Sequence, residues 1–262
     1  MSTTRPDPAS FRRRLNAGER LLGTFIKTPT SHMSEIIGDI GYDFVVIDEE
    51  HAPFDRLAVD AALLGARASA TAGIVRVARS DAANILSALD DGAVGVLVPH
   101  VNTAERARQV VAAARYRGGR RGFSNSPRAG RYGAVPLRSH VERGDAQTTV
   151  IAMIEDPEAV HDIEAIVAVE GLDALFLGRA DLAVALGADT LDAPAVRGAV
   201  GRICDVTRKA SMRVCAMVGS PAESDWFAKL GVTVFIVASD QAFMRRAAAA
   251  ALEEFRTAWA AS

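Results

Sequence analysis

Hydrophobic and polar positions along this chain fall into blocks that predict short buried strands and longer amphipathic helices. Eight apolar runs rich in β-branched residues are too short for typical helices and predict strands at residues 21–27, 44–48, 73–78, 95–99, 149–155, 172–178, 213–218 and 232–238. Between them, apolar residues recur every three or four positions and predict helices near residues 33–39, 54–69, 82–91, 103–115, 157–169, 194–211, 221–230 and 240–258. Start signals for four of these helices are Asp81, Asn102, Asp156-Pro157 and Ser220-Pro221.

Eight strands alternating with eight helices in 262 residues predict an α/β fold of the (β/α)8 TIM-barrel type. A Rossmann-type sheet is the alternative, but no Gly-x-Gly-x-x-Gly follows a predicted strand and opens a helix. No linker divides the pattern, so we expect a polar N-terminal tail and lead-in over residues 1–18 and a single barrel domain over residues 19–262.

The connection over residues 116–148 is long and rich in glycine and arginine. Loops of this length within a compact domain are usually functional or partly helical, and residues 136–147 suit a short helix. A plain surface insertion and a loop that contacts an anion or another subunit are equally good interpretations.

The composition is ordinary for a globular protein, with 49% hydrophobic and 24% charged residues. The net charge of −2 gives no reason to expect nucleic acid or an anionic membrane as a partner. Charged residues interrupt every hydrophobic run before it reaches the length of a membrane span, and the N-terminus lacks the apolar region of a signal peptide. We therefore expect a cytoplasmic protein.

Ionisable side chains directly follow several predicted strands. They are Asp48, Glu50 and His51 after the second strand, Arg76 after the third, Glu155 after the fifth, and Asp181, next to Ala180, after the sixth. Because the carboxyl ends of barrel strands open onto one mouth, we expect these groups to converge. Each has an ordinary structural interpretation by itself, such as a helix cap for Asp181 or an ion pair with a core carboxylate for Arg76. Their recurrence over four strands favours a functional site.

The residue types at this mouth favour metal-assisted carbonyl chemistry. Two carboxylates without a cysteine or histidine cluster suit a hard cation such as Mg²⁺ or Mn²⁺, which can polarise a carbonyl and stabilise an enolate. Arg76 offers a planar donor fork for an oxygen anion, and His51 is suited to move protons near neutral pH. A Schiff-base mechanism would instead need a desolvated lysine in the barrel, and of the three lysines only Lys27 ends a strand.

The chain resembles a known enzyme family in five motifs that span it from about residue 20 to the last helix. These are Ile47-Asp48-Glu49-Glu50-His51-Ala52-Pro53, Val75-Arg76, Leu97-Val98-Pro99, Met153-Ile154-Glu155 and Gly178-Arg179-Ala180-Asp181-Leu182. They are similar to motifs of the HpcH/HpaI aldolases, the metal-dependent (class II) pyruvate aldolases. The resemblance implies a (β/α)8 barrel of the phosphoenolpyruvate/pyruvate type, whose last helix is exchanged between subunits of a homohexamer built as a trimer of dimers. It also implies a lyase that reversibly cleaves 4-hydroxy-2-oxo acids to pyruvate and an aldehyde through a metal-stabilised enolate.

The same resemblance implies roles for individual residues. Glu155 and Asp181 would hold a divalent cation (Mg²⁺, Mn²⁺ or Co²⁺), and Arg76 would stabilise the enolate. His51 would be the acid–base group, and Asp90 of a neighbouring subunit would raise the basicity of that histidine. The residues in contact with the substrate would be Arg76, Met153, Ala180 and Asp181. Four departures put the aldehyde half of the substrate in doubt: Met153 where some relatives carry glutamine, Arg179 in place of a common proline, Glu49 as an added acid beside the histidine, and His100 as an extra polar group.

Two other functions stay open at this stage. A citrate-lyase-like or malyl-CoA-type lyase would act on a CoA thioester, although no basic groove for CoA phosphates is evident outside residues 117–131. A non-catalytic barrel that binds a keto acid would normally have lost the metal carboxylates or the base, whereas this chain keeps both kinds of residue.

Overall fold

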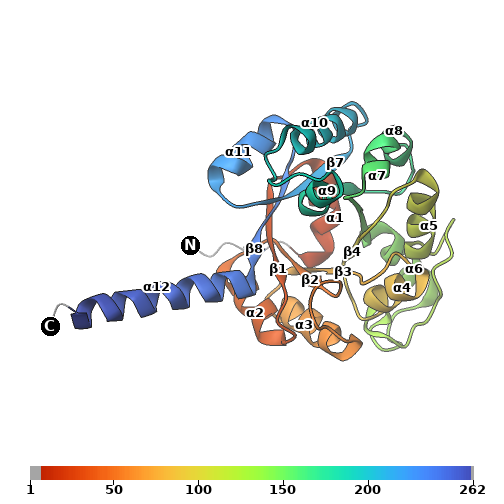
Figure 1. Cartoon of the computed structure of the whole chain (residues 1–262). Coiled ribbons are helices and arrows are strands. Elements are labelled where there is room, and N and C mark those ends of the chain that lie inside the picture. The colour runs from red at the N-terminus through yellow and green to blue at the C-terminus, as the bar shows by residue number, and fades with distance from the viewer. Residues whose placement is uncertain (1–6, 261–262) are drawn as a thin grey trace.

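The computed structural model describes residues 7–260 and forms a closed barrel of eight parallel strands (Figure 1). The strands are β1 (Leu21–Ile26), β2 (Phe44–Asp48), β3 (Ala72–Arg76), β4 (Gly95–Val98), β5 (Thr149–Ile154), β6 (Ala174–Leu177), β7 (Arg213–Val218) and β8 (Val234–Ser239). They pair in chain order, and β8 closes the barrel by pairing with β1. The predicted (β/α)8 fold is confirmed, and each strand boundary lies within two residues of its predicted position.

Helices surround the barrel and connect its strands (Figure 1). They are α1 (Phe11–Ala17), α2 (Ser31–Ile40), α3 (Arg56–Ala68), α4 (Ala82–Asp90), α5 (Ala104–Ala114), α6 (Leu137–Gln147), α7 (Pro157–His161), α8 (Ile163–Val167), α9 (Arg179–Ala185), α10 (Pro194–Lys209), α11 (Pro221–Lys229) and α12 (Asp240–Ala260), with 3-10 turns η1 (Pro8–Ser10) and η2 (Arg128–Gly130). The short helix expected at residues 136–147 is α6. Asp81 and Ser220 cap their helices as predicted, whereas Thr103, one residue after the predicted Asn102, caps α5.

Strand side chains alternate between two apolar layers, because successive residues of a strand point to opposite faces. Phe25, Val46, Ile74, Met153 and Phe176 belong to the layer inside the barrel. The larger layer lies between the strands and the surrounding helices. This alternation decides which side chains reach the barrel interior at the ends of the strands.

Residues 11–17 form a helix that the sequence pattern did not predict. Phe11 and Leu15 of α1 are buried in the inner layer, and the Phe11 ring lies 5.2 Å from that of Phe44. Their spacing of four residues is the helical signal, but the intervening arginines, Arg12 to Arg14, make the segment look like a polar tail. From residue 7 onward, the expected tail therefore contains folded elements; residues 1–6 lie outside the described part of the chain.

Two other differences affect the region after β5. The helix predicted over residues 157–169 is divided into α7 and α8 at Asp162, whose carboxylate accepts a hydrogen bond of 2.8 Å from the Ala104 amide. An additional helix, α9, begins at Arg179 directly after β6. Its first turn contains Asp181, so this helix positions one of the candidate metal ligands.

The last helix, α12, projects away from the barrel (Figure 1). Phe243 near its start is partly buried against the barrel and lies 6.3 Å from the ring of Tyr42. Residues 244–260 are all exposed, including Leu252, Phe255 and Trp259. Neither α12 nor any other helix within residues 7–260 combines the length and apolar character needed to cross a membrane.

Candidate active site

Strand register brings three ionisable side chains to the carboxyl end of the barrel. Asp48, Arg76 and Glu155 each follow an interior apolar residue by two positions, as Glu155 follows Met153. Since side chains of a strand alternate, these three also point inward. All three are buried. The expected convergence at the mouth is therefore seen for the ends of β2, β3 and β5.

Arg76 and Asp48 form a buried, two-pronged ion pair. Arg76 Nε donates to Asp48 Oδ1 at 2.8 Å, and Nη2 donates to Oδ2 at 2.6 Å. Lys27 Nζ lies 2.9 Å from the same Oδ2, and the Arg76 guanidinium lies 4.9 Å from the centre of the Phe25 ring. The ion-pair interpretation of Arg76 is thus correct, and Asp48 holds the guanidinium in place. Nη1 makes no hydrogen bond to Asp48 and instead lies 3.3 Å from Glu50 Oε2.

Glu155 is a buried carboxylate close to two other acidic side chains, Glu50 and Asp181. Burial raises the pKa of Glu155 to about 7, the charges of Glu50 and Asp181 act in the same direction, and His100 opposes them. Gly178 makes this packing possible, because a Cβ at that position would lie 2.4 Å from the Glu155 Cβ. A bound cation would offset the electrostatic cost of this carboxylate, so Glu155 fits the metal role.

Asp181 approaches Glu155 from the first turn of α9 and is exposed. Ala180 is exposed in the same turn, whereas Met153 is buried inside the barrel. Across residues 7–260, no three His, Cys, Asp or Glu side chains are already grouped as a metal site. A cation held by Glu155 and Asp181 would therefore take two carboxylates from this chain and keep its other positions for water and substrate oxygens.

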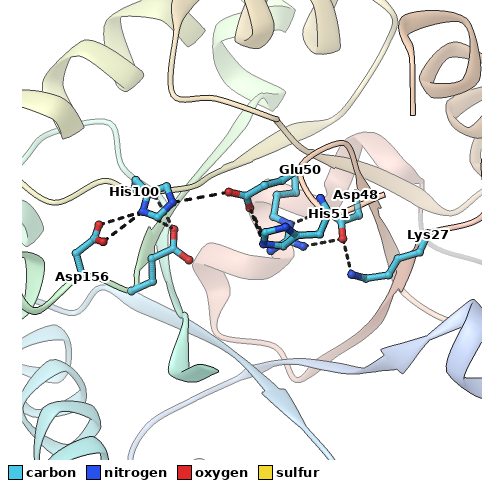
Figure 2. A network of polar contacts seen from close by, with 8 residues as sticks. Lys27, Asp48, Glu50, His51, His100 and Asp156 are labelled. Carbon is cyan, nitrogen blue, oxygen red and sulfur yellow. Dashed lines mark hydrogen bonds and ion pairs between the residues drawn. The ribbon is translucent and has the colours of Figure 1, made fainter. Parts of the chain in front are cut away.

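His100 links the carboxylates on two sides of the mouth. Its Nδ1 lies 3.3 Å from both carboxylate oxygens of Asp156 and 3.5 Å from Glu155 Oε1, and its Nε2 lies 3.9 Å from Glu50 Oε1. Its backbone amide donates to Glu155 Oε1 at 2.7 Å. Burial lowers the pKa of His100, but the three carboxylates outweigh this effect and raise it. Figure 2 shows this histidine between Asp156 and Glu50.

Sequence reasoning missed the connection between His100 and Asp156. Asp156 occupies the N-cap position of α7 before Pro157, as predicted, but its side chain makes no capping hydrogen bond and instead faces His100. His100 has a left-handed backbone with φ of 52°, which is uncommon for a residue other than glycine. The sequence did carry one indication of this role: His100 comes just after β4, as the other residues at the mouth come just after or at the ends of their strands.

His51 is exposed at the mouth, next to Glu50. Its Nε2 lies 3.8 Å from Glu50 Oε2, and its backbone amide donates to Asp48 Oδ1 at 3.1 Å (Figure 2). Glu50 Oε2 also lies 3.3 Å from Arg76 Nη1, although this buried oxygen accepts no hydrogen bond from the residues that the structure describes. Glu50 therefore connects the candidate proton-transfer histidine with the candidate enolate-binding arginine.

Asp90 lies apart from these residues within the same chain. It ends α4, which starts after β3 at the mouth and returns the chain to the opposite end of the barrel. Its carboxylate accepts a hydrogen bond of 3.1 Å from Arg121 Nη2. Within the described chain, Asp90 thus pairs with Arg121, and no hydrogen bond or ion pair joins it to His51.

Comparisons with known proteins show the family and the fold of the chain. The HpcH/HpaI aldolase/citrate lyase family model matches residues 21–247. The chain is 42% identical over 189 residues to a 4-hydroxy-2-oxovalerate aldolase of Novosphingobium aromaticivorans, which covers 70% of this chain and 71% of that protein. It is 32% identical over 251 residues to a 5-keto-4-deoxy-D-glucarate aldolase of Klebsiella pneumoniae, covering 95% and 97%. The crystal structure of an HpcH/HpaI aldolase/citrate lyase family protein from Burkholderia cenocepacia matches with a TM-score of 0.89 at 30% identity, covering 95% of this chain and 99% of that chain.

Proposed function

The chain belongs to the HpcH/HpaI aldolase/citrate lyase family, and from this premise we propose that it is a class II, pyruvate-dependent aldolase. Its reaction would be the reversible cleavage of a 4-hydroxy-2-oxo acid to pyruvate and an aldehyde. One observation carries the proposal: Glu155, a buried carboxylate suited to a cation, shares the mouth with the guanidinium of Arg76 and with His51. The relatives named as aldolases support the reaction type, and their names differ in the aldehyde half of the substrate.

Glu155 and Asp181 would hold the divalent cation, which is Mg²⁺, Mn²⁺ or Co²⁺ in this proposal. When bound, such a cation supplies Lewis-acid stabilisation of the charge that develops on the 2-oxo group. Glu155 is fixed for this task by the His100 amide and by its packing against Gly178. The exposed Asp181 and Ala180 would border the keto-acid half of the substrate, with Met153 below it.

Proton transfer and charge stabilisation would fall to His51 and Arg76. In the cleavage direction the 4-hydroxyl loses its proton, the C3–C4 bond breaks, and its electron pair stays on the pyruvate fragment as an enolate. Protonation of C3 then gives pyruvate. His51 would accept and return these protons, and Arg76 Nη1 would donate hydrogen bonds to the enolate oxygen.

The substitution Arg76→Lys should lower kcat markedly, because lysine keeps the charge but not the planar fork that Asp48 holds. Steady-state kinetics with a cleavable 4-hydroxy-2-oxo acid measures this effect. The matched control is Arg79→Lys, near the same strand end but outside the network of Asp48, which should retain wild-type kcat. A rise in KM alone for Arg76→Lys would contradict a role in stabilising the enolate.

Activity should depend on a divalent cation, and this dependence tests the proposed function directly. A chelated, metal-free enzyme should release no pyruvate from a panel of 4-hydroxy-2-oxo acids, and addition of Mg²⁺, Mn²⁺ or Co²⁺ should restore release. Glu155→Ala and Asp181→Ala should weaken Mn²⁺ binding measured by calorimetry, whereas Asp189→Ala, a surface change, should not. Full activity in protein shown by elemental analysis to be metal-free, or a borohydride-trapped adduct with pyruvate, would refute the metal-enolate mechanism.

The geometry of Asp90 and α12 supports a homo-oligomer with shared active sites, in the form of a hexamer with exchanged last helices. The Asp90 carboxylate would reach His51 of a neighbouring subunit, since the two lie at opposite ends of one barrel. The exposed Phe255 and Trp259 of α12, whose rings lie 5.8 Å apart, would pack on that neighbour. Analytical ultracentrifugation of the full chain tests this assembly, and a stable, active monomer would exclude it.

A further inference from the structure

A cavity of about 130 Å³ lies at the end of the barrel opposite the candidate active site. Residues lining it include Gly92, Val94, Arg121, Ala129, His140 and Arg143. Gly92 and Val94 precede β4, so they lie at the amino ends of the strands, whereas Glu155 lies at the carboxyl ends. The other four belong to the arginine-rich connection over residues 116–148, whose role the proposed aldolase reaction leaves unexplained.

Arg121 lines this cavity with an unused hydrogen-bond donor. Its side chain is only 3% exposed, and its Nη2 donates to Asp90 at 3.1 Å. The guanidinium also stacks on the ring of Tyr116, with a distance of 4.4 Å to the ring centre. Its Nε is buried and has no hydrogen-bond partner among the described residues. A buried donor of this kind requires an acceptor, because leaving it unpaired costs free energy.

A second arginine beside the cavity, Arg128, also has buried N–H donors without an acceptor among the described residues. Arg128 lies across Gly92, where a Cβ would be 2.9 Å from its Cδ, and its Nη2 pairs with Asp60. Its Nε and Nη1 are both buried without a partner within residues 7–260. Gly92 has a φ of 99°, so the turn that receives Arg128 requires glycine both for its backbone and for the close contact.

Positive charge around the cavity exceeds the negative charge that faces it. Arg143 uses its Nη2 for the Ala129 carbonyl at 3.0 Å and has no carboxylate partner in the described chain. Arg121 and Arg128 are each matched by one carboxylate, so the charge of Arg143 remains. Burial lowers the pKa of His140, the charges of Arg121 and Arg143 lower it further, and the charge of Asp90 opposes them.

We propose that this cavity binds a small tetrahedral oxyanion, with inorganic phosphate as its representative. Its volume is several times the roughly 10–15 Å³ that one water needs, which leaves room for such an ion. The oxygens would accept the N–H of Arg121 Nε and balance the charge of Arg143, since guanidinium groups bind oxyanions through directed hydrogen bonds. The bound ion would stabilise the packing of the 116–148 connection against the amino ends of the barrel strands.

Calorimetric titration of phosphate into the chelated full chain, at constant ionic strength in chloride, tests this proposal without relying on catalysis or on the metal. We expect saturable binding with one phosphate per chain and a rise in Tm with phosphate concentration. Arg143→Met should weaken the affinity by roughly tenfold or more, because one charge-assisted contact is lost. Arg138→Met is the matched control: it removes the same charge from the same helix, but its side chain is 84% exposed, so binding should be unchanged.

A second variant tests whether phosphate binding needs the space of the cavity and not only the positive charge around it. Ala129→Leu keeps every arginine but fills the cavity, so phosphate binding should be lost while the circular dichroism spectrum stays that of the wild type. Absence of saturable phosphate binding to the wild-type chain would overturn the proposal and leave water as the partner of these donors. Equal phosphate affinity in Arg143→Met and Arg138→Met would also overturn it.

Discussion

Replacing His51 by alanine should slow proton exchange at the methyl group of pyruvate by roughly 10²–10⁴-fold, the usual contribution of a positioned general base. His51 is exposed at the mouth beside Glu50, so it can reach a substrate without rearrangement of the core. Exchange of the methyl protons with deuterium, followed by NMR, reports this step without any aldehyde. Mn²⁺ affinity should stay at the wild-type value, because His51 is not a proposed metal ligand.

Two companion variants make the His51 experiment specific. His161→Ala removes another exposed histidine, at the end of α7, and should leave the exchange rate unchanged. Asp90→Asn should reduce exchange less than His51→Ala, because it alters the base through its neighbour and does not remove it. Mixed His51→Ala and Asp90→Ala subunits should regain partial activity if the two residues act across an interface. Wild-type exchange in His51→Ala would show that another group, with His100 as the first candidate, moves the proton.

The substitution Asp48→Asn should lower the free energy of unfolding by about 3–5 kcal/mol, the usual effect of removing one partner of a buried ion pair. Asp48 is fully buried and balances two cations, Arg76 at 2.6 Å and Lys27 at 2.9 Å. Asparagine keeps the size of the side chain but removes the carboxylate that both positive charges share, which leaves Arg76 with only its carboxylate contact to Glu50 at 3.3 Å. Urea unfolding at fixed protein concentration measures the loss. The surface variant Glu164→Gln, which breaks an exposed pair with Arg202, should cost less than about 1 kcal/mol.

The same variant should show a defined pH dependence. Burial raises the pKa of Asp48, but the hydrogen bond and charge of Arg76, together with Lys27, outweigh it and lower the pKa below its usual value. A carboxylate with a lowered pKa in the folded state stabilises the protein above the unfolded pKa of about 3.9, and this contribution disappears as the pH falls through the folded pKa. The stability difference between wild type and Asp48→Asn should therefore be constant from pH 5 to 7 and shrink below about pH 4. A difference independent of pH down to pH 2 would contradict the ion-pair explanation.

The sequence predicted the parts of the site that follow from strand periodicity. Asp48, Arg76 and Glu155 end apolar strands, and alternation alone places them inside a barrel. Asp156 could not be assigned in this way, because an acidic residue before proline has the pattern of a helix cap, and only the backbone turn at His100 diverts its carboxylate. Such side-chain contacts depend on loop conformation, for which a single sequence carries little information.

Long-range packing was the other limit of prediction. Phe11 and Leu15 form the base of the inner layer, yet the arginines between them conceal the apolar spacing. The partners of the buried Arg121 and Arg128 depend on how the 116–148 connection folds back on the barrel. The length and arginine content of that connection left two interpretations open, a plain surface insertion and a loop that contacts an anion or another subunit, so its role stays a prediction.

In the proposed oligomer, the projecting helix α12 would make the packing around each barrel depend on the concentration of subunits. Helices in proteins are held mainly by packing of an apolar face, and the 21-residue α12 offers its own barrel no such face after Phe243. In that oligomer the apolar side chains of α12 pack on a neighbouring subunit, and each subunit in turn receives the α12 helix of another. Dilution would then dissociate the subunits. We expect α12 to lose its helical structure first and the shared active site to be lost with it, while the barrel of eight strands stays folded.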